Sequence, residues 1–400
     1  MGEQIIKFKQ GKIYMTRFVY ADNAATTPVS KQVLDTVVPL LSDAWGNPSS
    51  LYSKGRDAAK IILDARKRIA DALGAKPNEI YFTASGSEAD NWAIKGSAYA
   101  NSARGKHIIS TKVEHHAVLN ALASLEKEGF EVTYLDVDSN GLVYPEQVEK
   151  AIREDTILVA IMYANNEIGT VMPIKEIAEV AKSHKVTMFT DAVQAIGNVP
   201  LNLSELGVDM LALSGHKLGA PKGVGALYIK TGTRCRNLID GGGQERGRRG
   251  GTENTAYIAG FATALESAVS SLDDMPRIAA MRDRLARAIT EKIPRSRIHG
   301  TMENRLSGNV NFGFDCIEGE SLVLLLDMAG IAASTGSACS SASLEPSHVL
   351  LSIGIPPEKA HGSLRISLSH GNTDEDVDYI IEKLPPIVAR LREMSPLWKE

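Results

Sequence analysis

The chain has 400 residues, 44% of them hydrophobic and 23% charged, a composition typical of a globular enzyme with a large core and two or three domains. Its net charge of -4 excludes a general attraction to nucleic acid or to an anionic membrane, although residues 246–249 form one local basic cluster. The three cysteines, Cys235, Cys316 and Cys339, show no CxxC spacing, which argues against a disulfide framework and a zinc site. We therefore expect no bound metal and no nucleic-acid partner.

Targeting signals are the next feature. No segment approaches the roughly 18 consecutive apolar residues of a membrane-spanning helix, and the N-terminus lacks the apolar core of a signal peptide. An odd number of cysteines fits a reducing compartment. These observations predict a cytoplasmic protein without membrane attachment.

From about Asn23 to Ile229, short apolar runs alternate with helical patterns. The predicted strands are Ile80–Phe82, His107–Thr111, Val132–Val137, Ile157–Tyr163, Val186–Ala192, Met210–Gly215 and Gly225–Lys230. Helix candidates of ten or more residues lie between several strands, such as Pro173–His184. This alternation predicts an α/β fold with a mostly parallel seven-stranded sheet covered on both faces, in which ligands bind beyond the carboxyl ends of the strands.

The pattern changes after the glycine-rich residues 241–251. A long helical stretch is predicted from about Thr255 to Ile293, with an interruption near Pro276. The tail then mixes the strands NVNFGF and SLRISLS with helices, as in an α+β module. We expect a large domain over residues 19–262 and a smaller domain over residues 263–400, which residues 1–18 join.

Two neighbouring strand ends carry a lysine, an acid, an amide and a histidine. Asp191 and Gln194 follow one predicted strand, and His216 and Lys217 follow the next. Pyridoxal phosphate needs a lysine for a Schiff base and a carboxylate that keeps its ring nitrogen protonated. Either residue alone fits an ordinary turn, but the combination at adjacent strand ends indicates a pyridoxal-phosphate site.

The cofactor phosphate needs a site of its own, and TASGSEADNWAIKG opens a helix directly after a predicted strand. Ser85 and Glu88 have the spacing of a capping box, which would form in any well-capped helix. Gly86 and Ser87 leave amide groups open at the helix N-terminus, a favourable place for an anion. The lysine strand adds two more candidate donors, Ser214 and His216.

The stretch from Ser334 to Leu350, STGSACSSASLEPSHVL, places one cysteine among serines, alanines and a glycine. The nearest histidine, His348, is nine positions beyond Cys339, so no catalytic dyad is local. Such small, polar residues predict a mobile loop, and a thiol on a mobile loop indicates a carrier. Cys235 and Cys316 lie beside apolar or strand-like segments and are interpreted as structural.

Nine motifs occur in one order across nearly the whole chain. They are DNAATTP, GNPSSLYSKG, VEHHAVLNAL, NNEIGTVMPI, TDAVQAIG, GHKLGAPKGVGALY, GGGQERGRRGGTEN, GSACSSASLEPSHV and HGSLRISLS. This series resembles the cysteine desulfurases, pyridoxal-phosphate enzymes of the class V aminotransferase fold, and most closely the NifS/IscS type; the first 18 residues lie outside the resemblance. The resemblance implies an aspartate aminotransferase-like fold, a homodimer and L-cysteine as the substrate.

The resemblance also implies roles for individual residues. Lys217 would form the Schiff base and remove the substrate α-proton, and Asp191 would hold the ring nitrogen. His115 would lie over the ring face and move protons, and Gln194 would face the ring hydroxyl. The phosphate would be held by Gly86, Ser87, Ser214, His216 and, from the other subunit, Thr252.

For the substrate, the resemblance implies that Asn166 and Arg365 bind the carboxylate, the arginine as a bidentate pair. Cys339 would take the sulfur as a persulfide, leave alanine, and pass the sulfur to an iron–sulfur scaffold or another acceptor protein. Nitrogen fixation, general iron–sulfur assembly and tRNA thiolation are all possible destinations. Ala24 and Gly219 depart from the family pattern, at positions that carry no chemistry.

Two alternatives remain open on the residues alone. A selenocysteine lyase or another class V transaminase would share Lys217 and Asp191, but a transaminase has no use for a sulfur-accepting thiol. A non-catalytic sulfur-relay scaffold would present Cys339 to partners without needing His115 or Arg365.

Overall fold

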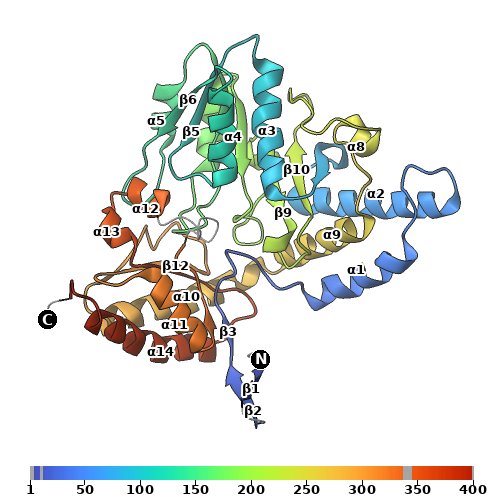
Figure 1. Ribbon diagram of the computed structural model, residues 1–400. Coiled ribbons are helices and arrows are strands. Elements are labelled where there is room, and N and C mark those ends of the chain that lie inside the picture. The colour runs from blue at the N-terminus through green and yellow to red at the C-terminus, as the bar shows by residue number, and fades with distance from the viewer. Residues whose placement is uncertain (1–3, 10–11, 337–344, 399–400) are drawn as a thin grey trace.

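A seven-stranded sheet forms the centre of the molecule (Figure 1). The computed structural model describes residues 4–9, 12–336 and 345–398 of the chain. In spatial order the strands are β4 (Ile80–Thr83), β10 (Gly225–Ile229), β9 (Met210–Ser214), β8 (Thr187–Asp191), β7 (Thr156–Ala160), β5 (His107–Thr111) and β6 (Glu131–Leu135). Strand β10 is antiparallel to both neighbours and the other pairs are parallel, so the predicted mostly parallel seven-stranded sheet is confirmed.

Helices cover both faces of this sheet, and alternate strand residues enter two different cores. Ile108 and Leu158 pack in one core with α3 (Gly86–Asn101) and α4 (His116–Glu126). Ile109 and Val159 pack in the other core, which also contains residues of several further helices. Among these helices are α2 (Ser53–Leu73), α6 (Ile174–Ser183) and α9 (Thr255–Ser270). Burial on both faces explains why the strands read as continuous apolar runs.

A second, smaller body is built on a three-stranded antiparallel sheet. Its strands are β11 (Ser296–Ile298), β12 (Asn309–Phe314) and β14 (Ser363–Ser367), and its helices are α10 (Met275–Lys292), α11 (Gly319–Met328) and α14 (Asp374–Glu393). Pro276 stands in the first turn of α10, where its missing N–H costs nothing, so the predicted interruption near this proline is confirmed.

The predicted boundary between residues 262 and 263 falls inside α9, whose Leu265 still packs in the core of the large sheet. Two short helices of the C-terminal part, α12 (His348–Ser352) and α13 (Pro357–Ala360), also contribute buried residues to that core. The chain therefore passes between the two bodies more than once, and the division into residues 19–262 and 263–400 stays a prediction.

The N-terminal strands β1 (Gln4–Lys9) and β2 (Lys12–Arg17) form an antiparallel hairpin that extends away from the rest of the molecule (Figure 1). Arg17 donates to the Asp376 carboxylate of α14 at 3.0 Å. The next strand, β3 (Val19–Tyr20), pairs in parallel with β13 (Ile331–Ala332) and buries Val19 in the core of the smaller body.

The remaining helical elements connect these layers. They are α1 (Lys31–Asp43), α5 (Pro145–Ala151), α7 (Leu203–Leu206), α8 (Gln244–Gly247) and the 3₁₀ turns η1 (Pro77–Glu79), η2 (Gly215–Lys217) and η3 (Leu272–Asp274). Within the described part of the chain, every helix is too short or too polar to cross a membrane.

A buried ion pair shapes the glycine-rich loop around α8. Glu245 and Arg246 have φ values of +46° and +59°, a left-handed conformation that costs energy for residues with a side chain. The Glu245 carboxylate accepts two hydrogen bonds from the Arg66 guanidinium, at 2.6 and 2.8 Å, and one from the Phe82 amide at 2.9 Å. These contacts hold the loop against α2 and β4 and offset the backbone strain.

We predict that Glu245→Ala lowers the free energy of unfolding by about 3–5 kcal/mol, because it leaves the buried Arg66 cation without its partner. Asp71→Ala is the matched control, since it breaks an exposed ion pair with Lys67 on the same helix and should leave stability almost unchanged. Denaturant unfolding of the three proteins gives the comparison, and equal losses for the two variants would contradict the prediction.

Candidate active site

The carboxyl ends of adjacent strands bring the predicted site residues to one rim of the sheet. Strand β8 ends at Asp191, and β9 leads into η2, which ends at Lys217. The segment after β5 carries His115, which caps α4. A ring nitrogen of His115 and a carboxyl oxygen of Asp191 lie within 4.8 Å of each other. The positive charge of Lys217 lowers the pKa of both groups. The structure thus brings the lysine, the acid and the histidine together.

Asp191 is a buried carboxylate with defined partners. Its side chain accepts a hydrogen bond from the Val193 amide at 2.9 Å, and its backbone carbonyl accepts from the Tyr163 amide at 2.8 Å. Burial raises the pKa of Asp191, whereas His115 and Lys217 lower it. A cationic ring nitrogen placed beside this acid would further favour its ionised form.

A short segment of the N-terminal region wraps around Lys217. The Lys217 amine donates to the carbonyl oxygens of Ala24 and Ala25, the latter at 2.7 Å, and the Gln194 amide donates to the Ala24 carbonyl at 3.0 Å. Thr27 accepts from the Gly219 amide at 2.8 Å. Gly219 has a φ of +83°, so the left-handed backbone favours glycine at this position.

His115 is a half-buried imidazole with an assignable tautomer. Its Nδ1 accepts a hydrogen bond from the Ala117 amide at 3.1 Å, so the neutral ring carries its proton on Nε2. Burial lowers the pKa of His115, while the nearby Asp191 opposes this effect. The neutral ring can therefore donate a proton from Nε2 and accept one there after donation.

The predicted phosphate site has the geometry of a tight strand-to-helix turn. Ser85 Oγ accepts from the Glu88 amide at 3.1 Å and so caps α3. A Cβ atom on Gly86 would lie 2.8 Å from Val193 and 3.2 Å from Ser214, so only glycine lets this helix start so close to β9.

The other predicted phosphate donors differ in their exposure. Ser87 and Thr252 are exposed, whereas His216 is half-buried and contacts the Thr26 hydroxyl at 3.1 Å. Burial and the neighbouring Lys217 lower the pKa of His216 to about 4, so its ring is neutral near pH 7. A neutral imidazole can donate a hydrogen bond to a phosphate from one nitrogen.

Arg365, on β14 of the smaller body, is 1% exposed and already engaged. Nη1 donates to the carbonyl oxygens of Asn166 and Gly336, both at 3.0 Å, and Nη2 donates to the Asp22 carboxylate at 2.8 Å. The structure therefore places the two predicted substrate residues together. Asp22, inside the DNAATT motif, was missed as a partner, because its ionic contact links residues 343 positions apart.

Two donors of the Arg365 guanidinium are left over. Nε has no hydrogen-bond partner among the residues that the structure describes, and Nη2 keeps a second hydrogen. The Nε–H group and one Nη2–H group are therefore available, and a carboxylate binds a guanidinium through such a pair where both hydrogens point along one edge of the plane.

Two buried acids near His115 were not identified from the sequence. Glu114 accepts from the Thr111 hydroxyl at 2.7 Å and from the Met162 amide at 3.0 Å, and burial raises the pKa of Glu114 to about 8. Asp90 lies on α3, one turn beyond Gly86, and is 2% exposed. Both lie inside stretches quoted above, Glu114 in VEHHAVLNAL and Asp90 in TASGSEADNWAIKG, so their position was a usable signal, but their burial was not readable from the sequence.

We predict that Glu114→Gln flattens the dependence of stability on pH. In the unfolded chain this glutamate ionises near its ordinary pKa of 4.5, whereas the folded protein keeps it protonated to about pH 8. Stability is therefore lost as the pH rises through this window, by on the order of 5 kcal/mol in total. Thermal unfolding of the apoproteins between pH 5 and pH 9 should show that the stability of the variant increases relative to that of wild type as the pH rises.

The exposed Glu146→Gln serves as the control for this experiment, because its unfolding curve should follow wild type at every pH. If the Glu114→Gln and wild-type curves run parallel across the pH range, Glu114 is ionised in the folded protein and the prediction is wrong.

The three cysteines differ in what the structure says of them. Cys339 lies outside the described residues. Cys235 packs against the backbone of Trp92, and burial raises the pKa of its thiol to about 12, so it stays protonated and inert near neutral pH. Cys316 is half-buried and its thiol donates to the Leu397 carbonyl at 3.5 Å. Both environments fit the interpretation of these two residues as structural.

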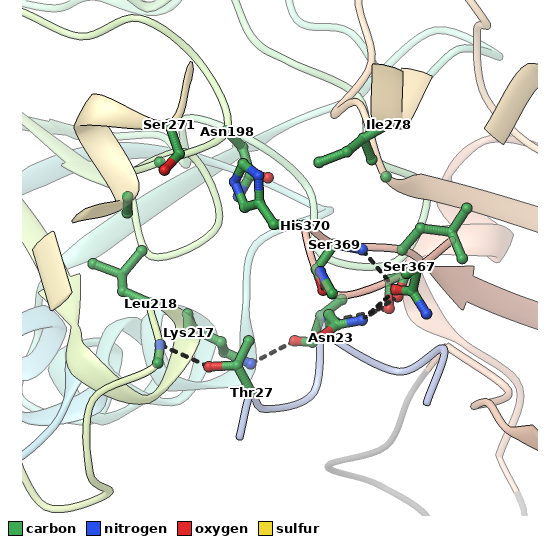
Figure 2. Close-up of a pocket in the computed structure, with 18 of the residues that line it drawn as sticks. Asn23, Thr27, Asn198, Lys217, Leu218, Ser271, Ile278, Ser367, Ser369 and His370 are labelled. Atoms are coloured by element: carbon green, nitrogen blue, oxygen red, sulfur yellow. Dashed lines mark hydrogen bonds between the residues drawn. The ribbon is translucent and has the colours of Figure 1, made fainter. Parts of the chain in front are cut away.

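A cavity of about 520 Å³ adjoins Lys217 (Figure 2). Figure 2 shows Lys217, Thr27 and Asn23 on one side of the cavity and His370 beside Asn198 on the other. The lysine is therefore reachable from the space between the two bodies of the molecule.

Comparison with known proteins agrees with this site. Residues 19–380 match the family model described as aminotransferase class-V. The cysteine desulfurase IscS of Clostridium botulinum (strain Hall) is 54% identical over 389 residues, covering 96% of this chain and 98% of the relative. The cysteine desulfurase IscS of Methanosarcina thermophila is 55% identical over 380 residues, covering 95% and 94%.

Solved structures give the same result. A structure described as a NifS-like protein has a TM-score of 0.88 and 38% identity, and it covers 94% of this chain and 100% of its own. Another, described as SspA in complex with cysteine, has a TM-score of 0.77 and 38% identity, covering 88% and 98%. The chain belongs to the aminotransferase class-V family. More narrowly, it falls among the cysteine desulfurases of that family, and the resemblance of its motifs is confirmed.

The cofactor of this family is pyridoxal phosphate, and the residues present fit it. Lys217 offers an amine at the rim of the sheet, and Asp191 offers a buried acid for the ring nitrogen. The contact distances around Gly86 leave no room for a side chain, as expected where a helix N-terminus approaches a phosphate closely.

Proposed function

We propose that the protein is a cysteine desulfurase that converts L-cysteine to L-alanine and holds the sulfur as a persulfide on Cys339. An acceptor protein of iron–sulfur cluster assembly would then take the sulfur. The observation that carries this proposal is the convergence of Lys217, Asp191 and His115 in a chain 54% identical to a cysteine desulfurase. We further propose that the protein acts in the cytoplasm.

When bound, pyridoxal phosphate supplies an electron sink for the negative charge that develops at the substrate α-carbon. Lys217 would anchor the cofactor through Nζ and, once displaced by the substrate amine, would remove the α-proton. Asp191 would keep the ring nitrogen protonated, and His115 would cover the ring and move protons through Nε2. Gln194 would face the ring hydroxyl.

The cofactor phosphate would lie at the N-terminus of α3. Its donors would be Gly86, Ser87, Ser214, His216 and, from a second subunit, Thr252. The proposal is supported by the capped helix start and by the neutral state that burial and Lys217 impose on His216. Thr252 is exposed on the loop that follows α8, so it is available to a second copy of the chain.

The substrate carboxylate would bind the free edge of Arg365, made by Nε and Nη2. Asn166 would support this arginine through its backbone carbonyl. The segment that carries Cys339 begins and ends beside these residues. At its start, the Gly336 carbonyl accepts from Arg365 at 3.0 Å, and just beyond its end Ser347 donates to Glu167 at 2.6 Å. These anchors support delivery of a thiol to the substrate.

We predict that Cys339→Ser separates cofactor chemistry from sulfur capture. The variant should bind pyridoxal phosphate, retain a borohydride-reducible link at Lys217 and still exchange the α-proton of cysteine with solvent. Its release of alanine should fall at least about a hundredfold, because a serine hydroxyl is almost never ionised near neutral pH and attacks sulfur poorly. Absorbance, proton exchange and alanine analysis measure the three steps.

Lys217→Ala is the control for this experiment and should lose both the covalent link and proton exchange. In wild-type protein treated with cysteine, peptide mass spectrometry should find a reductant-labile extra sulfur on Cys339. Alanine release at the wild-type rate by the serine variant, or extra sulfur on Cys235 or Cys316, would contradict the proposed role of Cys339 as the sulfur carrier.

We also propose that the protein is a homodimer. One face of α1 is apolar and exposed, with Leu34, Val38 and Leu41 at 44%, 58% and 58% exposure, and Trp45 beyond the helix end is 67% exposed. The spacing i, i+4, i+7 puts the three helix residues on one stripe, a pattern typical of a helix that packs against another surface. A second copy of this chain would cover the stripe and supply Thr252.

We predict that the double variant Val38→Asp, Leu41→Asp converts the protein from a dimer to a monomer, because two desolvated carboxylates cannot be accommodated in an apolar contact. Light scattering coupled to size-exclusion chromatography measures the mass directly. Leu324→Asp, at a 66% exposed position on α11 of the smaller body, is the control and should remain dimeric. A dimeric α1 variant would show that the subunits meet elsewhere.

A further inference from the structure

Asp90 is a buried acid for which the reaction, as described so far, has no use. It lies on α3, one turn after Gly86, and is 2% exposed. Its Oδ1 atom is buried and has no hydrogen-bond partner within the described part of the chain. Buried polar atoms are nearly always paired, so an orphaned carboxyl oxygen at this position needs an explanation.

Asp90 is part of a cluster of buried titratable groups. One carboxyl oxygen of Asp90, one of Asp191 and one ring nitrogen of His115 all lie within 4.8 Å of one another. Glu114, which precedes His115, is close enough for its charge to act on Asp90. These groups face Asp90 from β8 and from the segment before α4, and Lys217 acts in turn on Asp191 and His115.

The carboxyl groups in this cluster cannot all be ionised, and their partners differ. Asp191 accepts from the Val193 amide and is favoured as an anion by His115 and Lys217. Glu114 accepts from a hydroxyl and from the Met162 amide. The pKa of Asp90 lies well above its ordinary range. Burial is the largest cause, and the negative charges of Asp191 and Glu114 raise the pKa further. Asp90 and Glu114 are therefore the acids that keep their protons near pH 7, and of these two only Asp90 has a carboxyl oxygen without a partner in the described part of the chain.

A purely structural role would not call for a carboxyl group here. The neighbouring buried positions on α3 include Ala89, Trp92 and Ala93, each of which packs in an apolar core. An apolar residue at position 90 would avoid the cost of burying a carboxyl group. The presence of an acid beside Asp191 thus indicates that the side chain at position 90 makes a polar interaction.

We propose that Asp90 is a positioning residue, which carries a proton in the resting protein and donates it in a hydrogen bond to the Asp191 carboxylate. The proton stays on Asp90, so no group is transferred. The hydrogen bond favours the ionised form of Asp191 and fixes its direction, as partners of metal-bound or catalytic groups do. This inference rests on the proposed role of Asp191 toward the ring nitrogen of pyridoxal phosphate.

Asp90→Asn and Asp90→Leu test the proposal in the full-length protein. The amide of asparagine can donate the same hydrogen bond without titrating, whereas leucine branches at the same carbon, is larger and has no donor. The asparagine variant should keep the wild-type dissociation constant for pyridoxal phosphate and the wild-type pH midpoint of the cofactor absorbance. The leucine variant should bind the cofactor about ten- to a hundredfold more weakly and shift that midpoint. Thermal unfolding of the apoproteins verifies that both variants fold.

A double-mutant cycle shows whether Asp90 acts through Asp191. In an Asp191→Asn background, Asp90→Leu should cause no further loss of cofactor affinity, because the acceptor of its hydrogen bond has lost its charge. Additive losses, equal damage by asparagine and leucine, or a wild-type midpoint in Asp90→Leu would each overturn the proposal. Failure of the wild-type protein to bind pyridoxal phosphate would instead refute the proposed function.

Discussion

The adjacency of two parallel strands is the constraint on which the site depends. Asp191 of β8 lies opposite Ala212 of β9, so the acid at the end of one strand and the lysine just past the end of the next share one rim. Parallel strands end on the same side of a sheet, and where helices cover both faces, ligands bind beyond the carboxyl ends of the strands. Every other site residue is placed relative to these two, because the segments that carry them pack around the rim.

Burial then decides which groups at the rim are charged. Desolvation raises the pKa of Asp90, Glu114 and Asp191 and lowers the pKa of His115, so each group moves toward its neutral form. Only Asp191 has both a backbone donor and two basic neighbours that oppose this effect. Asp191 is therefore the acid of this cluster whose ionised form has the most support, as its proposed role beside a protonated ring nitrogen would require.

Arg365 links this rim to the smaller body. Its guanidinium joins β14 to Asp22 near the N-terminus, to the loop of Asn166 and to Gly336 at the start of the cysteine segment. A substrate carboxylate bound to the remaining edge of the arginine would contact all of these parts through one side chain. Under the proposed function, the substrate would bind the same buried cation that holds Gly336, the last described residue before Cys339.

Periodicity and local motifs were sufficient to predict the sheet, the break at Pro276 and the candidate pair of Lys217 and Asp191. These features depend on residues that are close together in the sequence. The ion pairs Asp22–Arg365 and Arg66–Glu245 span 343 and 179 positions and could not be read from any local pattern. The same holds for Asp90, whose place beside His115 and Asp191 follows from the packing of α3 against the sheet. The sequence by itself determined which chemical groups stand at the strand ends. Only the tertiary structure decided which of those groups are buried together, and burial sets their charge.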